Sequence, residues 1–353
     1  MNNIYLLIPE LKTRHSFAIA TVIETKGSTP QKSGSSALFD QSGLISGTIG
    51  GGVLEGKVQQ IARKSLETKE SGIYHFDFDH DISFKQDAIC GGNATVLIDA
   101  STAKSNVIFR QIKKSLHERI QGILVTIIHG SGETNVKIDR YWVTSAVKNG
   151  LPKHYADLLH GDVKGMLSVG YPGDFVKKEL LFGEEKGSIQ ALLEPIFPPS
   201  KLIIAGAGHI GRALAHLGKL LDFEVTVIDD RTEYANSENI PDADHIIVDD
   251  IGNAVEKLEK NSDTFIVIDT RGHANDASAL RPCINSGASY VGMIGSKTKI
   301  AMVHRSFIDN GWATQDQWSA IHAPIGLGIN SKTVEEIAVS IAAQLVLVRN
   351  RNK

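Results

Sequence analysis

The chain has 353 residues, of which 42% are hydrophobic and 22% are charged, and its formal net charge is −3 at pH 7. This length accommodates two globular domains, and the charge excludes a generally basic nucleic-acid-binding or membrane-surface protein. Two cysteines, Cys90 and Cys283, are too few for a disulfide framework and favour a reducing compartment. The N-terminus lacks the basic segment and apolar run of a secretory signal. We therefore expect a cytoplasmic protein with neither nucleic-acid nor membrane partners.

The first half of the chain has a mixed pattern of elements. Strand-like segments alternate with glycine-rich turns, and two stretches have helical periodicity. The predicted strands cover 17–24, 35–39, 94–98 and 123–129, and the predicted helices cover 54–66 and 106–119. These elements predict an α+β domain over residues 1–195, although the pattern does not determine its topology.

Three glycine-rich clusters in this half are candidates for ligand binding. The first follows a strand and offers hydroxyl and main-chain N–H groups to an anion, although a plain surface turn has the same composition. The second precedes a helix, whose N-terminus favours a phosphate; a tight bend between strands is the alternative. The third places a cysteine beside two glycines. The candidate residues are Gly27, Ser28, Thr29, Gly50, Gly51, Gly52, Cys90, Gly91 and Gly92.

Two groups of residues between 74 and 92 could bind a metal ion. A thiolate at Cys90, on open backbone, could reach a metal or an electrophile, whereas a buried cysteine is often only a small hydrophobic residue. The segment 74–81 contains two histidines and three aspartates, but its alternation of aromatic and polar residues is also typical of a half-buried strand. No spacing there is specific for zinc or calcium.

Prolines at 195, 198 and 199 mark a joint, after which strands and helices alternate. Over 196–353 this alternation predicts an α/β, Rossmann-like, doubly wound parallel sheet with helices on both faces and strand order 3-2-1-4-5. The predicted strands are 201–205, 224–229, 245–249, 264–269 and 289–294, and the predicted helices are 209–221, 252–260, 275–286 and 297–310. A last helix begins at a capping box formed by Thr333 and Glu336 and is apolar on almost every side, which indicates burial in its own domain or in an oligomer contact.

The first strand of this half runs into a G-x-G-x-x-G turn, which is typical of dinucleotide-binding folds. Gly206 permits the tight turn, Gly208 lets the main chain approach a pyrophosphate, and Gly211 allows close packing of helix on strand. His209 lies in the turn. The next strand ends at Asp229, an acceptor for a ribose hydroxyl that favours NAD, while Arg231 could receive the 2′-phosphate of NADP.

Further small and polar residues follow the later strands. They are Asp269, Thr270, Arg271, Gly272 and His273 after one strand, and Gly292, Gly295 and Ser296 in and after the next. Because ligands of such sheets bind outside the carboxyl ends of the strands, these residues predict a ligand crevice along one edge.

Together these blocks resemble the XdhC/CoxI family of xanthine dehydrogenase accessory proteins. The resemblance rests on Gly27 to Pro30 with Gly34, on Gly47 to Gly52 with Glu55, and on Cys90 to Gly92. In the second half it rests on Gly206 to Gly211, Asp229 with Arg231, Gly292 to Ser296, and His322 to Leu327. Residues 100–195 contribute little.

The resemblance implies a maturation factor that is non-catalytic or only weakly catalytic. Such proteins bind the molybdenum cofactor (molybdopterin), shield it while its terminal sulfur is installed, and deliver it to an apo molybdenum hydroxylase, with a cysteine desulfurase as sulfur donor. The glycine-rich turns would then hold the phosphate of the pterin, and Cys90 would contact molybdenum. A homodimer is a further expectation.

Two other classes of function stay open on the sequence alone. The Rossmann-like half is compatible with an NAD(P)-dependent oxidoreductase in which His209 or His273 serves as an acid or base, although a nucleotide fold does not establish hydride chemistry. A plain assembly scaffold with a vestigial crevice is the third possibility.

Overall fold

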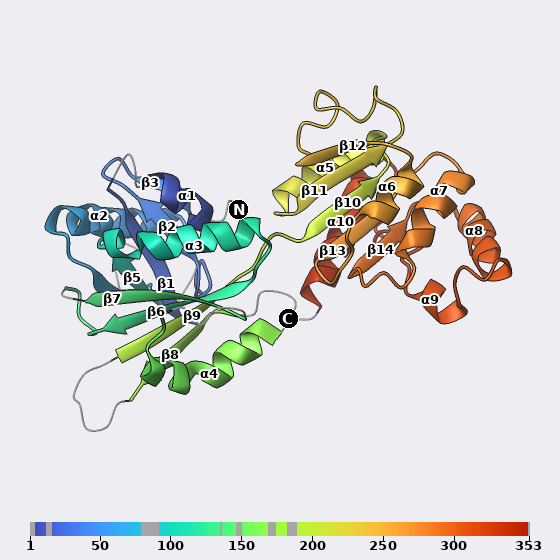
Figure 1. Ribbon diagram of the computed structural model, residues 1–353. Helices are drawn as coiled ribbons and strands as arrows, with labels where there is room; N and C mark the ends of the chain where they lie inside the picture. The colour runs from blue at the N-terminus through green and yellow to red at the C-terminus, as the bar shows by residue number, and fades with distance from the viewer. Residues whose placement is uncertain are drawn as a thin grey trace. The chain divides into compact units, whose positions relative to one another are not determined.

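The computed structural model describes residues 4–11, 16–78, 92–134, 136–145, 150–168, 174–181 and 189–351. They divide into two compact units that join between Pro198 and Pro199 (Figure 1). Pro195, after which the sequence predicts a domain boundary, lies within the last strand of the first unit. None of the described helices combines the length and the hydrophobicity that a bilayer span requires.

The first unit contains a five-stranded antiparallel sheet in the order β3-β2-β1-β5-β4. Helix α2 packs on one face of this sheet, where Leu54 and Val58 meet Ala18, Ala20 and Val22 (Figure 1). The elements are β1 (Ala18–Gly27), β2 (Ser36–Phe39), β3 (Leu44–Gly47), α2 (Gly52–Thr68), β4 (Gly72–Asp77) and β5 (Gly92–Asp99).

A second antiparallel sheet of the same unit has the order β7-β6-β9-β8. Helix α4 covers its outer face, and its inner face contributes Ile128 and Leu192 to a core shared with Ile23 and Leu97 of the first sheet. The unit is therefore layered, with helix, sheet, sheet and helix in succession. The elements are α1 (Ile4–Leu11), η1 (Thr102–Ser105), α3 (Asn106–His117), β6 (Gly122–His129), β7 (Lys137–Thr144), α4 (Lys153–Ser168), β8 (Val176–Leu180) and β9 (Ile189–Ile196).

The α+β prediction for this half is confirmed, and its predicted strands and helices are present. The sequence pattern missed α1, β3, α4, β7, β8 and β9. These elements are short, or they lack a strong alternation of polar and apolar residues. Their conformation depends on tertiary packing more than on the local pattern of polar and apolar residues.

Polar side chains are buried where the two sheets face each other. The Tyr5 hydroxyl donates to Glu194 Oε2 at 2.6 Å, and Arg140 forms an ion pair with buried Asp99. A cavity of about 10 Å³ beside them is lined by both sheets, including Thr21 and Glu194. Burial raises the pKa of Glu194 to about 7, against the lowering effects of the Tyr5 hydrogen bond and the Arg140 charge.

The raised pKa of Glu194 predicts that the stability of this unit falls as pH rises from about 4.5 to about 7. In that window the folded state holds a proton that the unfolded state has lost, so the loss reaches about 3 kcal/mol at most. Glu194→Gln removes this dependence while its amide oxygen still accepts from Tyr5. The check is urea unfolding of both proteins across this window.

Glu118→Gln, which removes a half-exposed carboxylate at the end of helix α3, serves as the matched control. It should keep the wild-type pH dependence. Parallel pH profiles for wild type and Glu194→Gln would contradict the assignment.

The second unit is a parallel sheet in the order β12-β11-β10-β13-β14, which in chain order is 3-2-1-4-5 and confirms the prediction. Alternate residues of the central strand face opposite cores: Leu202 and Ile204 pack with helices α5 and α10, and Ile203 and Ala205 pack with α6, α7 and α8. The strands are β10 (Lys201–Ala205), β11 (Glu224–Asp229), β12 (His245–Val248), β13 (Thr264–Ile268) and β14 (Tyr290–Met293).

The helices of this unit agree with the predictions except near Pro282. The helix predicted over 275–286 ends at Leu280 and continues as a short 3-10 turn, because proline lacks the N–H of a helix interior. The short α9 was not predicted. The helices are α5 (His209–Leu220), α6 (Ile251–Lys257), α7 (His273–Leu280), η2 (Arg281–Cys283), α8 (Lys297–Asp309), α9 (Gln315–Ser319) and α10 (Val334–Asn350).

The last helix, α10, is buried mainly within its own unit. Its predicted capping box is present, with Thr333 Oγ1 accepting from the Glu336 N–H at 3.2 Å and Glu336 Oε2 accepting from the Thr333 N–H at 3.1 Å. Ile341 and Leu345 are fully buried against the sheet, whereas Val339 remains 47% exposed.

Candidate functional site

Three glycine-rich clusters that are distant in sequence meet at one end of the first sheet. Gly27 and Gly92 are opposite each other in the antiparallel pairing of β1 with β5. A Cβ atom at Gly92 would lie 2.3 Å from the Lys26 carbonyl oxygen, and one at Gly50 would lie 2.7 Å from Pro30 Cβ. These close contacts require glycine, and they join the turns after β1 and after β3 with Gly92, the first residue of β5, into one glycine-turn cluster.

The main chain of this cluster is open at the start of helix α2. Gly50, Gly51 and Gly52 have φ angles of 131°, 69° and 55°, in the region that favours glycine. No heavy atom of the described residues lies within 4 Å of a Cβ atom built on Gly51 or Gly52. Gly51 is the N-cap of α2 and provides no side-chain hydrogen bond to the helix. The cluster thus presents uncovered main chain beside a helix N-terminus.

Hydroxyl groups lie in the turns of this cluster. Thr48 Oγ1 accepts from the Gly50 N–H at 3.2 Å and donates to Glu55 Oε2 at 3.1 Å, which anchors the turn to the first turn of α2. Ser28 and Lys26 are exposed, and Lys26 Nζ lies 3.4 Å from Glu24 Oε1. The Thr29 hydroxyl donates to the Gln31 carbonyl at 2.9 Å. The hydroxyls of Thr48 and Thr29 therefore donate within the protein, and the exposed Ser28 hydroxyl is the one that remains at the surface of the turn.

Two predicted site residues, Cys90 and Gly91, lie outside the described residues, as do the last residues of the segment 74–81. The first part of that segment is a strand, β4, and His75 is hydrogen bonded to the Thr95 hydroxyl across the sheet at 3.0 Å. Within the described ranges, no three His, Cys, Asp or Glu side chains are grouped to hold a metal ion. The half-buried-strand interpretation thus applies to the residues up to Asp77.

In the second unit, the glycines of the G-x-G-x-x-G turn differ in how closely they are packed. A Cβ atom at Gly206, whose φ is 130°, would lie 2.0 Å from the Asp269 carbonyl oxygen. One at Gly211 would lie 2.0 Å from the Gly206 carbonyl oxygen. Gly208, the N-cap of α5, faces open space. Two glycines therefore serve packing, and the middle one leaves the main chain accessible.

Asp229, at the end of β11, has both carboxylate oxygens in hydrogen bonds. Arg231 donates from Nε to Oδ1 at 2.8 Å and from Nη2 to Oδ2 at 2.9 Å, and the Ala207 N–H donates to Oδ2 at 2.8 Å. Burial acts to raise the pKa of Asp229, but these bonds outweigh it and hold the pKa below its ordinary value. The Arg231 guanidinium also stacks on Tyr234, 3.7 Å from the ring centre. A ribose hydroxyl would have to share or displace these partners.

Three carboxylates gather at this edge of the sheet, and the sequence singled out only Asp229 as a cofactor-binding residue. Asp269 follows β13, and fully buried Asp276 accepts from Thr270 Oγ1 at 2.6 Å and forms an ion pair with Lys299 of helix α8. Burial, together with the nearby Asp276 and Asp229, raises the pKa of Asp269 to about 7. Asp276 and Lys299 carried no signal in the sequence because both lie inside helical patterns.

The block His322 to Leu327 extends the same edge beyond β14. The His322 N–H donates to the Val291 carbonyl at 2.9 Å, and the Met293 N–H donates to the His322 carbonyl at 3.0 Å. The His322 ring stacks on Tyr290 with 4.6 Å between ring centres, and burial lowers the pKa of His322. The block His322 to Leu327 is thus hydrogen bonded to β14 through His322.

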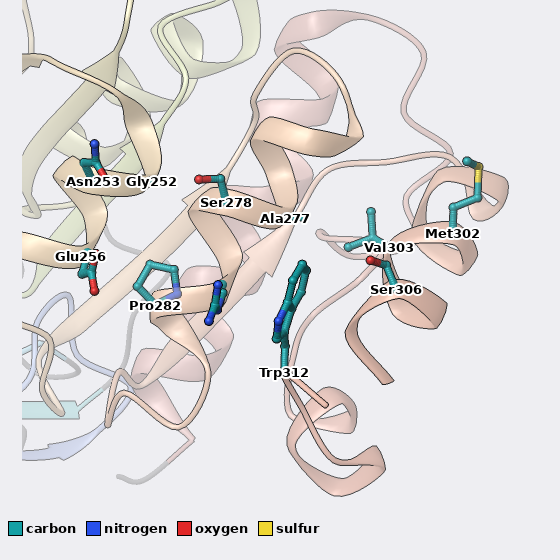
Figure 2. Close-up of a pocket in the computed structure, with 11 residues that line it drawn as sticks. Gly252, Asn253, Glu256, Ala277, Ser278, Pro282, Met302, Val303, Ser306 and Trp312 are labelled. Carbon is teal, nitrogen blue, oxygen red and sulfur yellow. The ribbon is translucent and has the colours of Figure 1, made fainter. Parts of the chain in front are cut away.

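A large groove of this unit lies on a helical face, away from the predicted site residues. Its volume is about 970 Å³, and its walls come from α6, α7 and α8, with Glu256, Ser278 and Met302 among the lining residues (Figure 2). Trp312 stands at the groove, and the Arg281 guanidinium lies 5.1 Å from its ring centre. Of the predicted site residues that the structure describes, none lines this groove.

The different packing of Gly211 and Gly208 predicts that alanine substitutions at these positions change stability by different amounts. Gly211→Ala would press a methyl group against the Gly206 carbonyl and should lower the free energy of unfolding by at least about 2 kcal/mol. Gly208→Ala, at φ −70° with no atom within 4 Å, should change it by less than about 1 kcal/mol. Urea unfolding followed by tryptophan fluorescence measures both. If Gly211→Ala lowered the free energy of unfolding no more than the small change expected for Gly208→Ala, the close packing at Gly211 would not matter for stability.

Comparison with known proteins gives concordant matches to both units. Residues 11–77 match the model of the XdhC and CoxI family, and residues 202–345 match that of the XdhC Rossmann domain. The chain is 24% identical to a protein of Bacillus subtilis (strain 168) named as a probable xanthine dehydrogenase subunit, over 99% of both chains. It is also 24% identical to the uncharacterized protein YqeB of Escherichia coli (strain K12), over 95% of this chain but only 44% of that protein.

A solved structure has the same fold. The crystal structure of a xanthine dehydrogenase from Bacillus halodurans superimposes with a TM-score of 0.80 and 23% identity, covering 99% of this chain and 96% of that chain.

Proposed function

Because the chain belongs to the XdhC and CoxI family, we propose that it is an accessory protein of a xanthine dehydrogenase-type molybdenum hydroxylase. In this role it binds the molybdenum cofactor, protects it during sulfuration and passes it to the apo-enzyme. The Bacillus subtilis relative, whose name describes a probable component of xanthine dehydrogenase, supports an association with such an enzyme. The partners we propose are the apo-hydroxylase, a cysteine desulfurase and a second copy of the chain.

The observation that carries this proposal is the contact of the turns after β1 and after β3 with each other and with Gly92. The cofactor is a pterin with a terminal phosphate, and a phosphate binds best to main-chain N–H groups near a helix N-terminus. The open backbone at Gly51 and Gly52, with the exposed Ser28 hydroxyl and the main chain of Thr29 in the same cluster, fits such a group. These residues would hold the phosphate.

We assign Cys90 a role in contact with the metal. Cys90 precedes Gly92, which lies inside the glycine-turn cluster, by two residues. A thiolate is a soft ligand that suits molybdenum or a transferred sulfur. In contrast, Cys283 is 3% exposed, and burial raises the pKa of its thiol to about 12, so it stays protonated and unreactive.

Cys90→Ala is expected to lose most of the molybdenum and pterin that co-purify with the protein from a host that makes the cofactor. The thiolate is the proposed metal contact, while the phosphate site alone would retain a little pterin. Metal analysis by mass spectrometry and fluorescence of the oxidised pterin measure the two components separately.

Cys283→Ala is the matched control, because it removes the other thiol from a core position and should keep wild-type loading. If Cys90→Ala retained full loading and activated the hydroxylase as well as the wild type does, the role of Cys90 would be wrong.

A further inference from the structure

Helix α10 has an apolar ridge on its outer side. Its inner side packs into the core through Ile341 and Leu345, which are fully buried, whereas Val339 is 47% exposed and Leu347 is 41% exposed. Ala343, midway between the two exposed residues, is partly exposed. Residues four positions apart lie on the same side of a helix and form a continuous ridge along it. We call the positions 335, 339, 343, 347 and 351 the outer ridge of α10.

The outer ridge has opposite charges at its two ends. Glu335 lies four positions before the first apolar residue of the ridge, and Arg351, the C-cap, which keeps helical dihedral angles, lies four positions after the last. Both are exposed, and among the residues that the structure describes neither has an ion-pair partner. The charged residues next to them are engaged. Glu336 caps the helix, and Arg349 Nη1 donates to the Leu221 carbonyl at 2.7 Å.

This ridge is complementary to a reversed copy of itself. Reversal about Ala343 exchanges Val339 with Leu347 and Glu335 with Arg351. In a twofold-symmetric contact, a residue of one copy meets its counterpart on the other copy in this reciprocal way. Ridges with this spacing interdigitate in the commonest class of helix pair, in which the axes cross at about 50°. The small side chain of Ala343 at the centre permits a close approach.

The charges favour one orientation of such a pair. When the two helices run in opposite directions, each Glu335 carboxylate is turned toward the Arg351 guanidinium of the second copy. When they run in the same direction, like charges come together at both ends, which costs free energy. The apolar residues also match in the antiparallel orientation, where Val339 of one copy faces Leu347 of the other.

We propose that the outer ridge of α10 is the surface by which two copies of this chain associate, with the two helices antiparallel and crossing at Ala343. The inference rests on the proposed function, which includes a second copy among the partners, and it assigns that partner a surface. A single pair of helices buries less than the about 1,600 Å² of a standard interface, so we expect a reversible dimer with a Kd on the order of 10 to 100 µM.

Sedimentation velocity of the full-length chain between about 1 and about 200 µM tests the proposal, because this range spans the expected Kd. Leu347→Glu places a carboxylate in the apolar ridge, facing Val339 and Glu335 of the second copy, and should weaken the dimer by about tenfold or more. Met302→Glu is the matched control. Met302 is 55% exposed in α8, which packs on the other face of the sheet, so this variant should dimerise as the wild type does.

Reversal of the end charges tests the orientation separately. Glu335→Arg and Arg351→Glu each create two like-charged pairs in a symmetric dimer, and each should weaken it by about threefold to tenfold. The double variant restores opposite charges across the contact and should regain the wild-type affinity. Urea unfolding of each variant verifies that the second unit is still folded.

The proposal is overturned if the wild type is monomeric over the whole concentration range, or if Leu347→Glu dimerises as the wild type does. It is also overturned if Met302→Glu weakens the dimer as much as Leu347→Glu, or if the double charge variant does not regain affinity. Cofactor loading separates this failure from that of the accessory role. A monomer that carries molybdenum cofactor contradicts only the dimer, and a dimer that never carries it contradicts only the accessory role.

Discussion

Close approach of main chain to main chain, at distances that no side chain could tolerate, organises both units of this protein. At Gly206, Gly211 and Gly92 a Cβ atom would meet a carbonyl oxygen at 2.0 to 2.3 Å. The contacts at Gly206 and Gly92 bring together residues from different strands or turns, and the contact at Gly211 lies within one turn. Where such turns end at a helix, as at Gly51 and Gly208, the main chain is left open to solvent. Within one motif, some glycines are therefore needed for close packing, and a neighbouring glycine leaves the main chain accessible to a ligand.

The two units use this arrangement differently. In the first unit the Thr48 hydroxyl accepts from the Gly50 N–H and donates to the Glu55 carboxylate, beside the open glycines. In the second unit the turn is surrounded by Asp229, Asp269 and Asp276, two of which are held by cations. Open glycines at a helix N-terminus therefore have hydroxyl neighbours in one case and carboxylates nearby in the other. The identity of the surrounding side chains, rather than the glycines, decides the chemistry.

Much of the second unit was predictable because its information is local. Short β-branched runs, helical periodicity and capping residues predict each element, and the handedness of parallel connections restricts the strand order. Pro282 ended a helix that the apolar pattern would have continued. The first unit was less predictable, because its strands pair with distant partners. The convergence of its three clusters depends on the register of Gly27 with Gly92 and on the contact of Gly50 with Pro30, which no local pattern encodes. Asp276 and Lys299 were missed for a related reason: their pairing exists only once two helices pack at one edge.

Amide hydrogen exchange of the full chain, with and without molybdenum cofactor released from a donor enzyme, would show which glycine turn holds the phosphate. If the first unit holds the phosphate of the pterin, the cofactor should slow exchange at Gly51, Gly52 and the first turn of α2, and at Ser28 and Thr29. The turn at Gly206 to Gly211 should be unaffected. Unchanged exchange in the glycine-turn cluster, with protection only at the Rossmann turn or nowhere, would contradict a phosphate site in the first unit.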